Sequence, residues 1–184
     1  KIHVLQQQQI EKERELTYLQ QMKEPELALH PQTVAARELL VAKGISFIPF
    51  YKAVEFKDGV TDIERIKIES ALRNAGILDA IIVENDDLSI NWQHNKILQA
   101  NNQLLDEQQS LLKWLYIDLP DDANVEARYV KQILQSIAID SQVLTTTAMI
   151  SKDGSYQIGL IHGHAPLIEE SAQYIGTRAR ERHR

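Results

Sequence analysis

The stretch TDIERIKIESALRNAGILDAIIVE, residues 61–84, carries the clearest fold signal in the sequence. Thr61 and Glu64 form a Thr-x-x-Glu capping box, which marks the first turn of a helix, and Gly76 stands where a left-handed C-terminal cap is expected. The apolar face between these two ends is formed by Ile63, Ile66, Ala71, Leu72 and Ala75. The segment DAIIVE, residues 79–84, then predicts a buried strand that follows the helix directly.

Upstream of this stretch, the sequence predicts a second helix and a strand. The segment PQTVAARELLVAKG, residues 31–44, begins with Pro31 in a first-turn position and ends with Gly44 at a capping position. Residues 46–56 alternate in polarity and are rich in aromatic and β-branched side chains, which favours a strand. Pro49 places part of this strand at a sheet edge or at a bulge.

Downstream, the sequence predicts two more helices and two closing strands. Residues 109–116 predict a short amphipathic helix, and residues 125–136 predict another. The inward face of the second one is formed by Val130, Ile133, Leu134 and Ile137. The strands VLTTTAMIS and YQIGLI are joined by a loop in which Asp153 and Gly154 favour a type I′ turn. Strands and helices are interspersed, so we predict a compact mixed domain of the α+β class.

Both ends of the chain predict helices that need a partner. Residues 1–24 place Ile2, Leu5, Gln9, Lys12, Leu16 and Leu19 at alternating steps of three and four. Near the other end the same spacing recurs at Ala172, Ile175, Ala179 and Arg182. Such a narrow stripe is stable only against another helix. We therefore expect residues 1–24 and 171–184 to be stubs of one antiparallel coiled coil, residues 25–170 to be the domain at its tip, and the chain to be a piece of a longer protein.

Composition excludes several kinds of site. The chain has no cysteine, so neither a disulfide nor a thiolate site can form. The formal net charge of −6 argues against nucleic-acid binding through overall charge. No apolar run reaches the ~20 residues that span a bilayer, and the first residues lack a signal-peptide pattern. We expect a cytoplasmic protein with no membrane partner.

The sequence shows no catalytic or cofactor-binding motif. It has neither a phosphate loop nor a dinucleotide fingerprint, and no nucleophile elbow. The Asp86-Asp87 and Asp121-Asp122 pairs lie where turns or helix starts already favour aspartate. His162 and His164 would face the same way on a strand, as two metal ligands or as ordinary loop histidines. We predict that the chain has no catalytic, cofactor-binding or metal-binding residue, requires no cofactor, and is not an enzyme.

Two sets of residues are candidates for binding. The last residues carry a basic cluster formed by Arg178, Arg180, Arg182 and Arg184. These guanidinium groups could hold several DNA phosphates without reading sequence, or could simply flank a solvated helix. Gly159 and Gly163 interrupt an apolar strand, where glycine marks either an internal bulge or the close approach of another backbone. If that backbone belongs to a second subunit, the predicted dimer interface comprises Ile158, Gly159, Leu160 and Gly163.

Four separated blocks together resemble a known family. They are ARELLVAKGISFIPFYKAVEF (36–56), ESALRNAGILDAIIV (69–83), ILQSI (133–137) and DGSYQIGLIHGHAPLIEESAQYIGTRARERHR (153–184). These blocks look like the hinge region of the SMC-like JetC subunits of bacterial Wadjet systems, which are related to the MukB and MksB condensins. The residues that match the family pattern are Gly76, Leu78, Asp79, Gly154, Gly159, Tyr174, Ile175 and Gly176, and the resemblance implies that they serve hinge architecture.

The resemblance also implies an order of parts and a function. In such proteins the chain runs out along one coiled-coil arm, folds a hinge and returns to ATPase heads, which would lie outside these residues. The resemblance implies a hinge that pairs two subunits for DNA engagement and loop extrusion in plasmid defence, in the bacterial cytoplasm and associated with DNA. Other condensin-like subunits would bind through parts outside this chain. The alternative is a stand-alone DNA-binding module that uses the C-terminal arginine cluster.

Overall fold

The structure is a computed structural model that describes residues 6–14, 27–84, 93–140, 148–167 and 172–176. After a helical segment at 6–14, the named helices are α2 (Pro31–Ala42), α3 (Asp62–Asn74) and α4 (Ala127–Leu134). The strands are β1 (Phe47–Pro49), β2 (Val54–Phe56), β3 (Ile81–Val83), β4 (Ile97–Leu98), β5 (Leu115–Ile117), β6 (Ala138–Ile139), β7 (Ala148–Ile150), β8 (Ser155–Ile158) and β9 (Ile161–His164). Short 3-10 helices occur at Phe50–Lys52, Glu107–Gln109 and Leu111–Lys113. The predicted mixed α+β class is confirmed.

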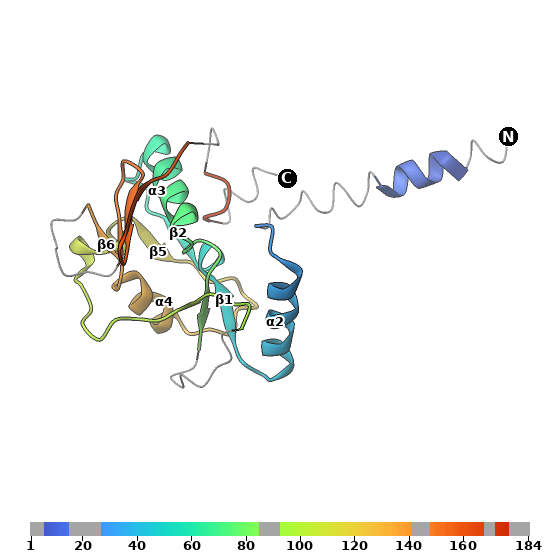
Figure 1. The fold of residues 1–184 in the computed structure, drawn as a ribbon, viewed down its shortest axis with the longest axis horizontal. Coiled ribbons are helices and arrows are strands. Elements are labelled where there is room, and N and C mark those ends of the chain that lie inside the picture. The colour runs from blue at the N-terminus through green and yellow to red at the C-terminus, as the bar shows by residue number, and fades with distance from the viewer. Residues whose placement is uncertain (1–5, 15–26, 85–92, 141–147, 168–171, 177–184) are drawn as a thin grey trace.

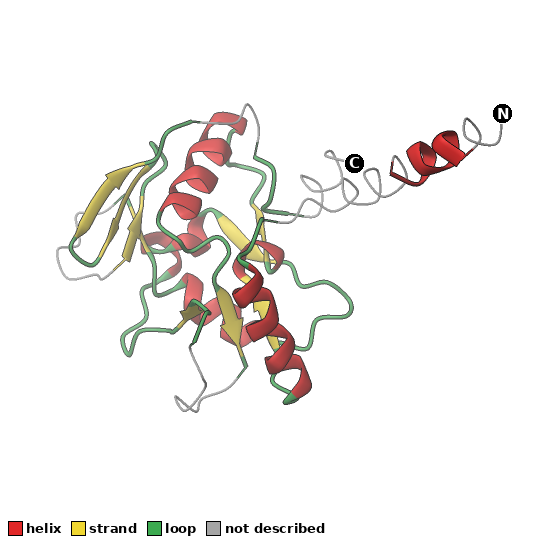
Figure 2. Cartoon of the chain, turned by 45° about the vertical axis from the view of Figure 1, so that its right-hand side comes forward, coloured by secondary structure: helices red, strands yellow, loops and turns green. Residues whose placement is uncertain are grey.

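The described strands form three small sheets. β3 is the middle strand of the first sheet, antiparallel to β1 and parallel to β4. β2 and β5 pair antiparallel in the second, and the third has the strand order β6-β7-β8-β9. Figures 1 and 2 show the four-stranded sheet on one side of the domain and α2 on the other, with α3 between them. The predicted buried strand at DAIIVE is β3, and all three of its residues are buried.

One main hydrophobic core joins the sheets. Its largest fully buried side chains are Phe50, Ile68, Leu72, Leu78, Ile82, Leu111, Leu115, Leu134, Ile150, Ile175 and Val54. Ile81 belongs to a second, smaller cluster with Leu40 and Val83. Leu27 near the start of the domain and Tyr174 near its end both pack against this core. Two chain segments separated by most of the sequence therefore complete the same core.

The helices predicted from capping signals are confirmed, but the predicted apolar face of α3 is only partly right, because Ile63 is 64% exposed and Ile68 is buried in its place. In α3 the Thr61 hydroxyl accepts from the Glu64 amide at 3.2 Å, and the Glu64 carboxylate accepts from the Thr61 amide at 3.2 Å. Gly76 follows with φ +82°, as a left-handed cap requires. α2 begins at Pro31 and is followed by Gly44 with φ +73°. The inward face predicted for α4 is also buried, at Val130, Ile133, Leu134 and Ile137.

The single strand predicted over 46–56 is wrong. The chain forms β1, then the 3-10 turn Phe50–Lys52, then β2, and the two strands belong to different sheets. In the turn, the amides of Phe50 and Tyr51 donate to the carbonyls of Ala80 and Leu78 at 2.9 and 3.2 Å. These bonds to the loop before β3 replace a continuous strand ladder, and they hold Phe50 in the core.

The short helix predicted over 109–116 is also wrong. This region forms two 3-10 turns and then β5. The side chain of Ser110 accepts from the amide of Leu112 at 3.3 Å, which ends one turn and starts the next. Leu115–Ile117 then pair with β2, so sheet formation outweighs the local helical pattern.

The two ends of the chain differ. Residues 6–14 are helical and every one of them is exposed. At the other end the helix predicted from the spacing of Ala172 and Ile175 is not present in residues 172–176, of which 174–176 form a bend. Ile175 is 0% exposed and lies in the domain core, so its side chain cannot belong to a coiled-coil seam. The predicted antiparallel pairing of the two stubs falls largely on residues outside the described ranges.

Among the helices described, none combines the length and the apolar character needed to cross a membrane.

Candidate functional site

The predicted interface residues lie on a β-hairpin formed by β8 and β9. Ile158 pairs with Ile161, so Gly159 and Leu160 alone make the turn. Gly159 has φ +54° and Leu160 is not among the residues with positive φ, which is the pattern of a type II′ turn. The predicted strand YQIGLI is therefore two strands, and Gly159 is required by the turn between them.

The preceding loop, between β7 and β8, also differs from its prediction. Gly154 has φ +98° and its amide donates to the carbonyl of Ser151 at 3.1 Å, whereas Asp153 has no positive φ. This is a three-residue loop with glycine in the left-handed position, and not a two-residue type I′ turn. The carboxylate of Asp153 accepts from the amide of Ser155 at 2.8 Å, and this bond is the main cause of the lowered pKa of Asp153.

The apolar face of the hairpin is anchored by Tyr156. Its cross-strand partner is Gly163, and a Cβ added to Gly163 would lie 2.3 Å from the Tyr156 ring. The Tyr156 hydroxyl donates to the side-chain oxygen of Asn74, at the end of α3, at 2.5 Å. The close neighbour of Gly163 is therefore a ring of its own chain, which is the internal alternative that the sequence left open.

The opposite face of the hairpin is polar. In β9 the residues His162 and His164 are two apart, so they lie on one face, opposite Gln157 and Ser155 of β8. Both histidines are exposed. Within the described ranges, no group of three or more histidine, aspartate or glutamate side chains is placed to hold a metal ion.

The tip of the hairpin exposes apolar surface beside a strand edge that no described strand pairs with. Leu160 is 99% exposed and Ile161 is 61% exposed. β9 is the outer strand of its sheet in the order β6-β7-β8-β9. An exposed edge strand with apolar neighbours is a template for pairing with another chain. Ile161 was missed by the sequence analysis, because its exposure depends on the second turn that the prediction lacked.

The same tip borders an open cleft of about 490 Å³. Its apolar lining comprises Ala75, Ile77, Ala80, Ile97, Leu98, Ile133, Ile137, Ala148 and Ile158, and Gly159 stands at its border. These residues come from several separate segments of the chain. No local sequence pattern could have brought them together, so the cleft is a product of the tertiary fold.

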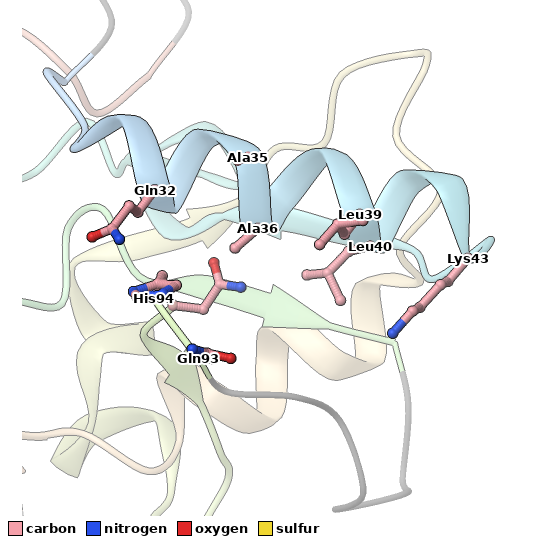
Figure 3. Close-up of a pocket in the computed structure, with 9 residues that line it drawn as sticks. Gln32, Ala35, Ala36, Leu39, Leu40, Lys43, Gln93 and His94 are labelled. Atoms are coloured by element: carbon pink, nitrogen blue, oxygen red, sulfur yellow. The ribbon is translucent and has the colours of Figure 1, made fainter.

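A second apolar surface lies on α2. Figure 3 shows Leu39 and Leu40 beside a pocket of about 180 Å³ that is also lined by His94, with Lys43 at its far end. Val34 and Val41 of the same helix are 42% and 66% exposed. The sequence signal for this surface was present, because α2 carries more apolar residues than one buried face needs.

Two further predictions concern parts of the chain or partners that the structure does not describe. The arginine cluster, Arg178, Arg180, Arg182 and Arg184, lies outside the described residues, so the DNA-binding alternative rests on sequence alone. It stays a prediction that a second subunit contacts the chain at Ile158, Gly159, Leu160 and Gly163. Comparison of the chain with protein-family models, with curated proteins and with solved structures finds no match in any of the three.

Proposed function

We propose that this chain is the hinge and dimerisation domain of an SMC-like condensin ATPase of a Wadjet type, and that it pairs two subunits through the β8–β9 hairpin. The observation that carries the proposal is the exposed tip of that hairpin. Leu160 and Ile161 present apolar side chains to solvent next to the edge of β9 that carries no partner strand within the described ranges. A second copy that pairs with this edge would bury both side chains and satisfy its backbone groups.

The adjoining cleft supports the same proposal. The surface area that Leu160 and Ile161 alone would bury is too small to hold two proteins together, because an obligate interface buries about 2,000 Å² or more in total. The cleft beside Gly159 extends the apolar surface from the hairpin toward Ile77 and Ile97. In a twofold dimer the same surface of each copy contacts the other copy, so this surface must be complementary to itself. The hairpin tip of one copy would insert into the cleft of its partner, and the reverse.

The placement of the two chain ends supports a domain at the tip of two arms. Leu27 lies just after the predicted N-terminal stub, and Ala172 and Tyr174 lie at the start of the C-terminal one. All three pack against the main core. Both ends of the domain are therefore anchored in its core, which is a condition that a hinge bearing two coiled-coil arms has to meet.

Analytical ultracentrifugation at micromolar concentration tests the proposal. We expect a dimer for the unchanged chain and a shift toward monomer for Leu160→Lys, because a charged side chain at the tip would be buried without a partner. Ile63→Lys is the matched control, since Ile63 is 64% exposed in the first turn of α3, at the opposite end of that helix from Asn74 and from the tip of the hairpin. A chain that stays monomeric at all concentrations, or an equal effect of both variants, contradicts the proposal.

A further inference from the structure

The last described segment, residues 172–176, is held by side chains and not by a sheet or helix. The amides of Gln173, Tyr174 and Ile175 all donate to the carboxylate of Glu69, at 2.8, 2.8 and 2.7 Å. Glu69 lies on α3, more than a hundred residues earlier in the chain, and is 6% exposed. Three successive backbone donors therefore converge on one buried carboxylate.

A carboxylate suits this arrangement better than any neutral side chain. Its two oxygens offer about four acceptor positions and no donor, so three amides can be satisfied at once. Burial raises the pKa of Glu69 above its ordinary value, while the three amide bonds and the nearby Arg73 act in the opposite direction. Burial of the charge thus costs free energy, and the three amide bonds offset part of that cost.

The side chain of Tyr174 adds a second set of contacts. Its ring lies 6.0 Å from the ring of Tyr51 in an edge-on arrangement at 78°. The guanidinium of Arg73 lies 5.4 Å from the centre of the same ring. Tyr174 therefore touches both α3 and the 3-10 turn after β1, and both contacts have favourable geometry.

At the end of the segment, Gly176 lies against a second buried carboxylate, that of Glu55. It has φ +90°, and a Cβ added there would lie 2.1 Å from both carboxylate oxygens of Glu55. Glu55 lies on β2 and is 7% exposed. Only glycine suits this position, because a Cβ would collide with the Glu55 carboxylate and because a positive φ is unfavourable for residues with a side chain.

We propose that residues 172–176 form a clasp, closed by Glu69 at one end and by the Glu55–Gly176 contact at the other, which opens and closes as a unit. The physical reason is that each contact depends on the rest. If Ile175 leaves the core, the Glu69 carboxylate loses its donors, and a carboxylate left buried without partners is strongly unfavourable. Because no strand or helix ladder holds this segment, it can open without breaking the sheets, although opening exposes Ile175. This inference does not depend on dimerisation.

Native-state hydrogen exchange on the whole chain tests the clasp. In Glu69→Leu, which keeps volume but removes every acceptor, we expect the amides of Gln173, Tyr174 and Ile175 to exchange together and at least about 10-fold faster. The amides of β3 should keep their rates. Glu69→Gln, which keeps one acceptor oxygen, should give a smaller acceleration. Glu38→Gln, at an exposed position on α2, is the control and should change none of these rates.

A second variant acts from the other end of the clasp and covers the case in which Glu69→Leu fails to fold. Gly176→Ala should accelerate the same three amides, because its Cβ collides with the Glu55 carboxylate. Gly59→Ala is its control, since nothing lies within 4 Å of a Cβ at that position. The proposal is overturned if the three amides respond independently, if none responds to Gly176→Ala, or if β3 accelerates by the same factor.

Discussion

The ring of Tyr156 lies across Gly163 on the neighbouring strand, so closely that a methyl group at position 163 would overlap the ring. The hydroxyl of the same tyrosine is bonded to Asn74 at the end of α3. This pair therefore attaches the β8–β9 hairpin to the domain, and it places the exposed tip at Leu160 at a defined position.

Gly163→Ala should destabilise the domain through this contact. The new methyl group would displace the Tyr156 ring, and overpacking of this kind costs about 1 to 3 kcal/mol. The double variant with Tyr156→Ala should cost less than the sum of the two single changes, because the collision is removed. Urea unfolding measures all three, and Gly59→Ala, in open space, is the control. Strict additivity contradicts the assigned contact.

Two leucines on helices give a test of the core. Leu134 on α4 is 0% exposed and Leu39 on α2 is 58% exposed. Leu134→Ala should lower the free energy of unfolding by about 2 to 5 kcal/mol, because it removes buried surface and leaves a cavity. The same change at Leu39 should stay within about 0.5 kcal/mol. Similar losses at both positions would show that the core boundary is wrongly placed.

The capping box of α3 predicts a smaller and local effect. Thr61→Ala removes the acceptor for the Glu64 amide and should cost about 1 kcal/mol in thermal or urea unfolding. Ser70→Ala, in the middle of the same helix, is the comparison. The Ser70 hydroxyl donates to the carbonyl of Ile66, which the helix already uses, so its loss should change stability little. A larger effect at Ser70 than at Thr61 contradicts this assignment.

Two glutamates on α3 predict opposite dependences of stability on pH. Burial raises the pKa of Glu69 above its ordinary value of 4.5, so its contribution to stability is full below that value and is lost as the pH rises through the folded pKa. Hydrogen bonds with Thr61 lower the pKa of Glu64, so its contribution is present above 4.5 and is lost as the pH falls through the folded pKa.

Urea unfolding of Glu69→Gln and Glu64→Gln at several pH values checks both signs. The stability difference between the unchanged chain and Glu69→Gln should grow in favour of the unchanged chain from about pH 7 to about pH 4. For Glu64→Gln the corresponding difference should shrink from about pH 5 to about pH 3. Parallel curves for the two variants contradict the assigned directions of the pKa shifts.

The parts of the fold that were predictable are those with short-range causes. The capping box at Thr61, the glycines after α2 and α3, and the apolar face of α4 each depend on residues a few positions apart. The candidate site was partly predictable as well. Gly159 and Gly163 stand out in an apolar run, but the sequence could not say that one makes a turn and that the other lies under Tyr156.

The sequence by itself determined the helices α2, α3 and α4, the buried strand β3 and the mixed class of the fold, because hydrophobic period and capping act within one or two turns. Only the tertiary structure decided the 3-10 turn at Phe50–Lys52, β5, the second hairpin turn and the non-helical segment 172–176. Their backbone groups are satisfied by distant partners, such as the Glu69 carboxylate 104 to 106 residues from the amides that it binds. A local pattern carries no information about such a partner, and burial of the backbone makes that partner obligatory.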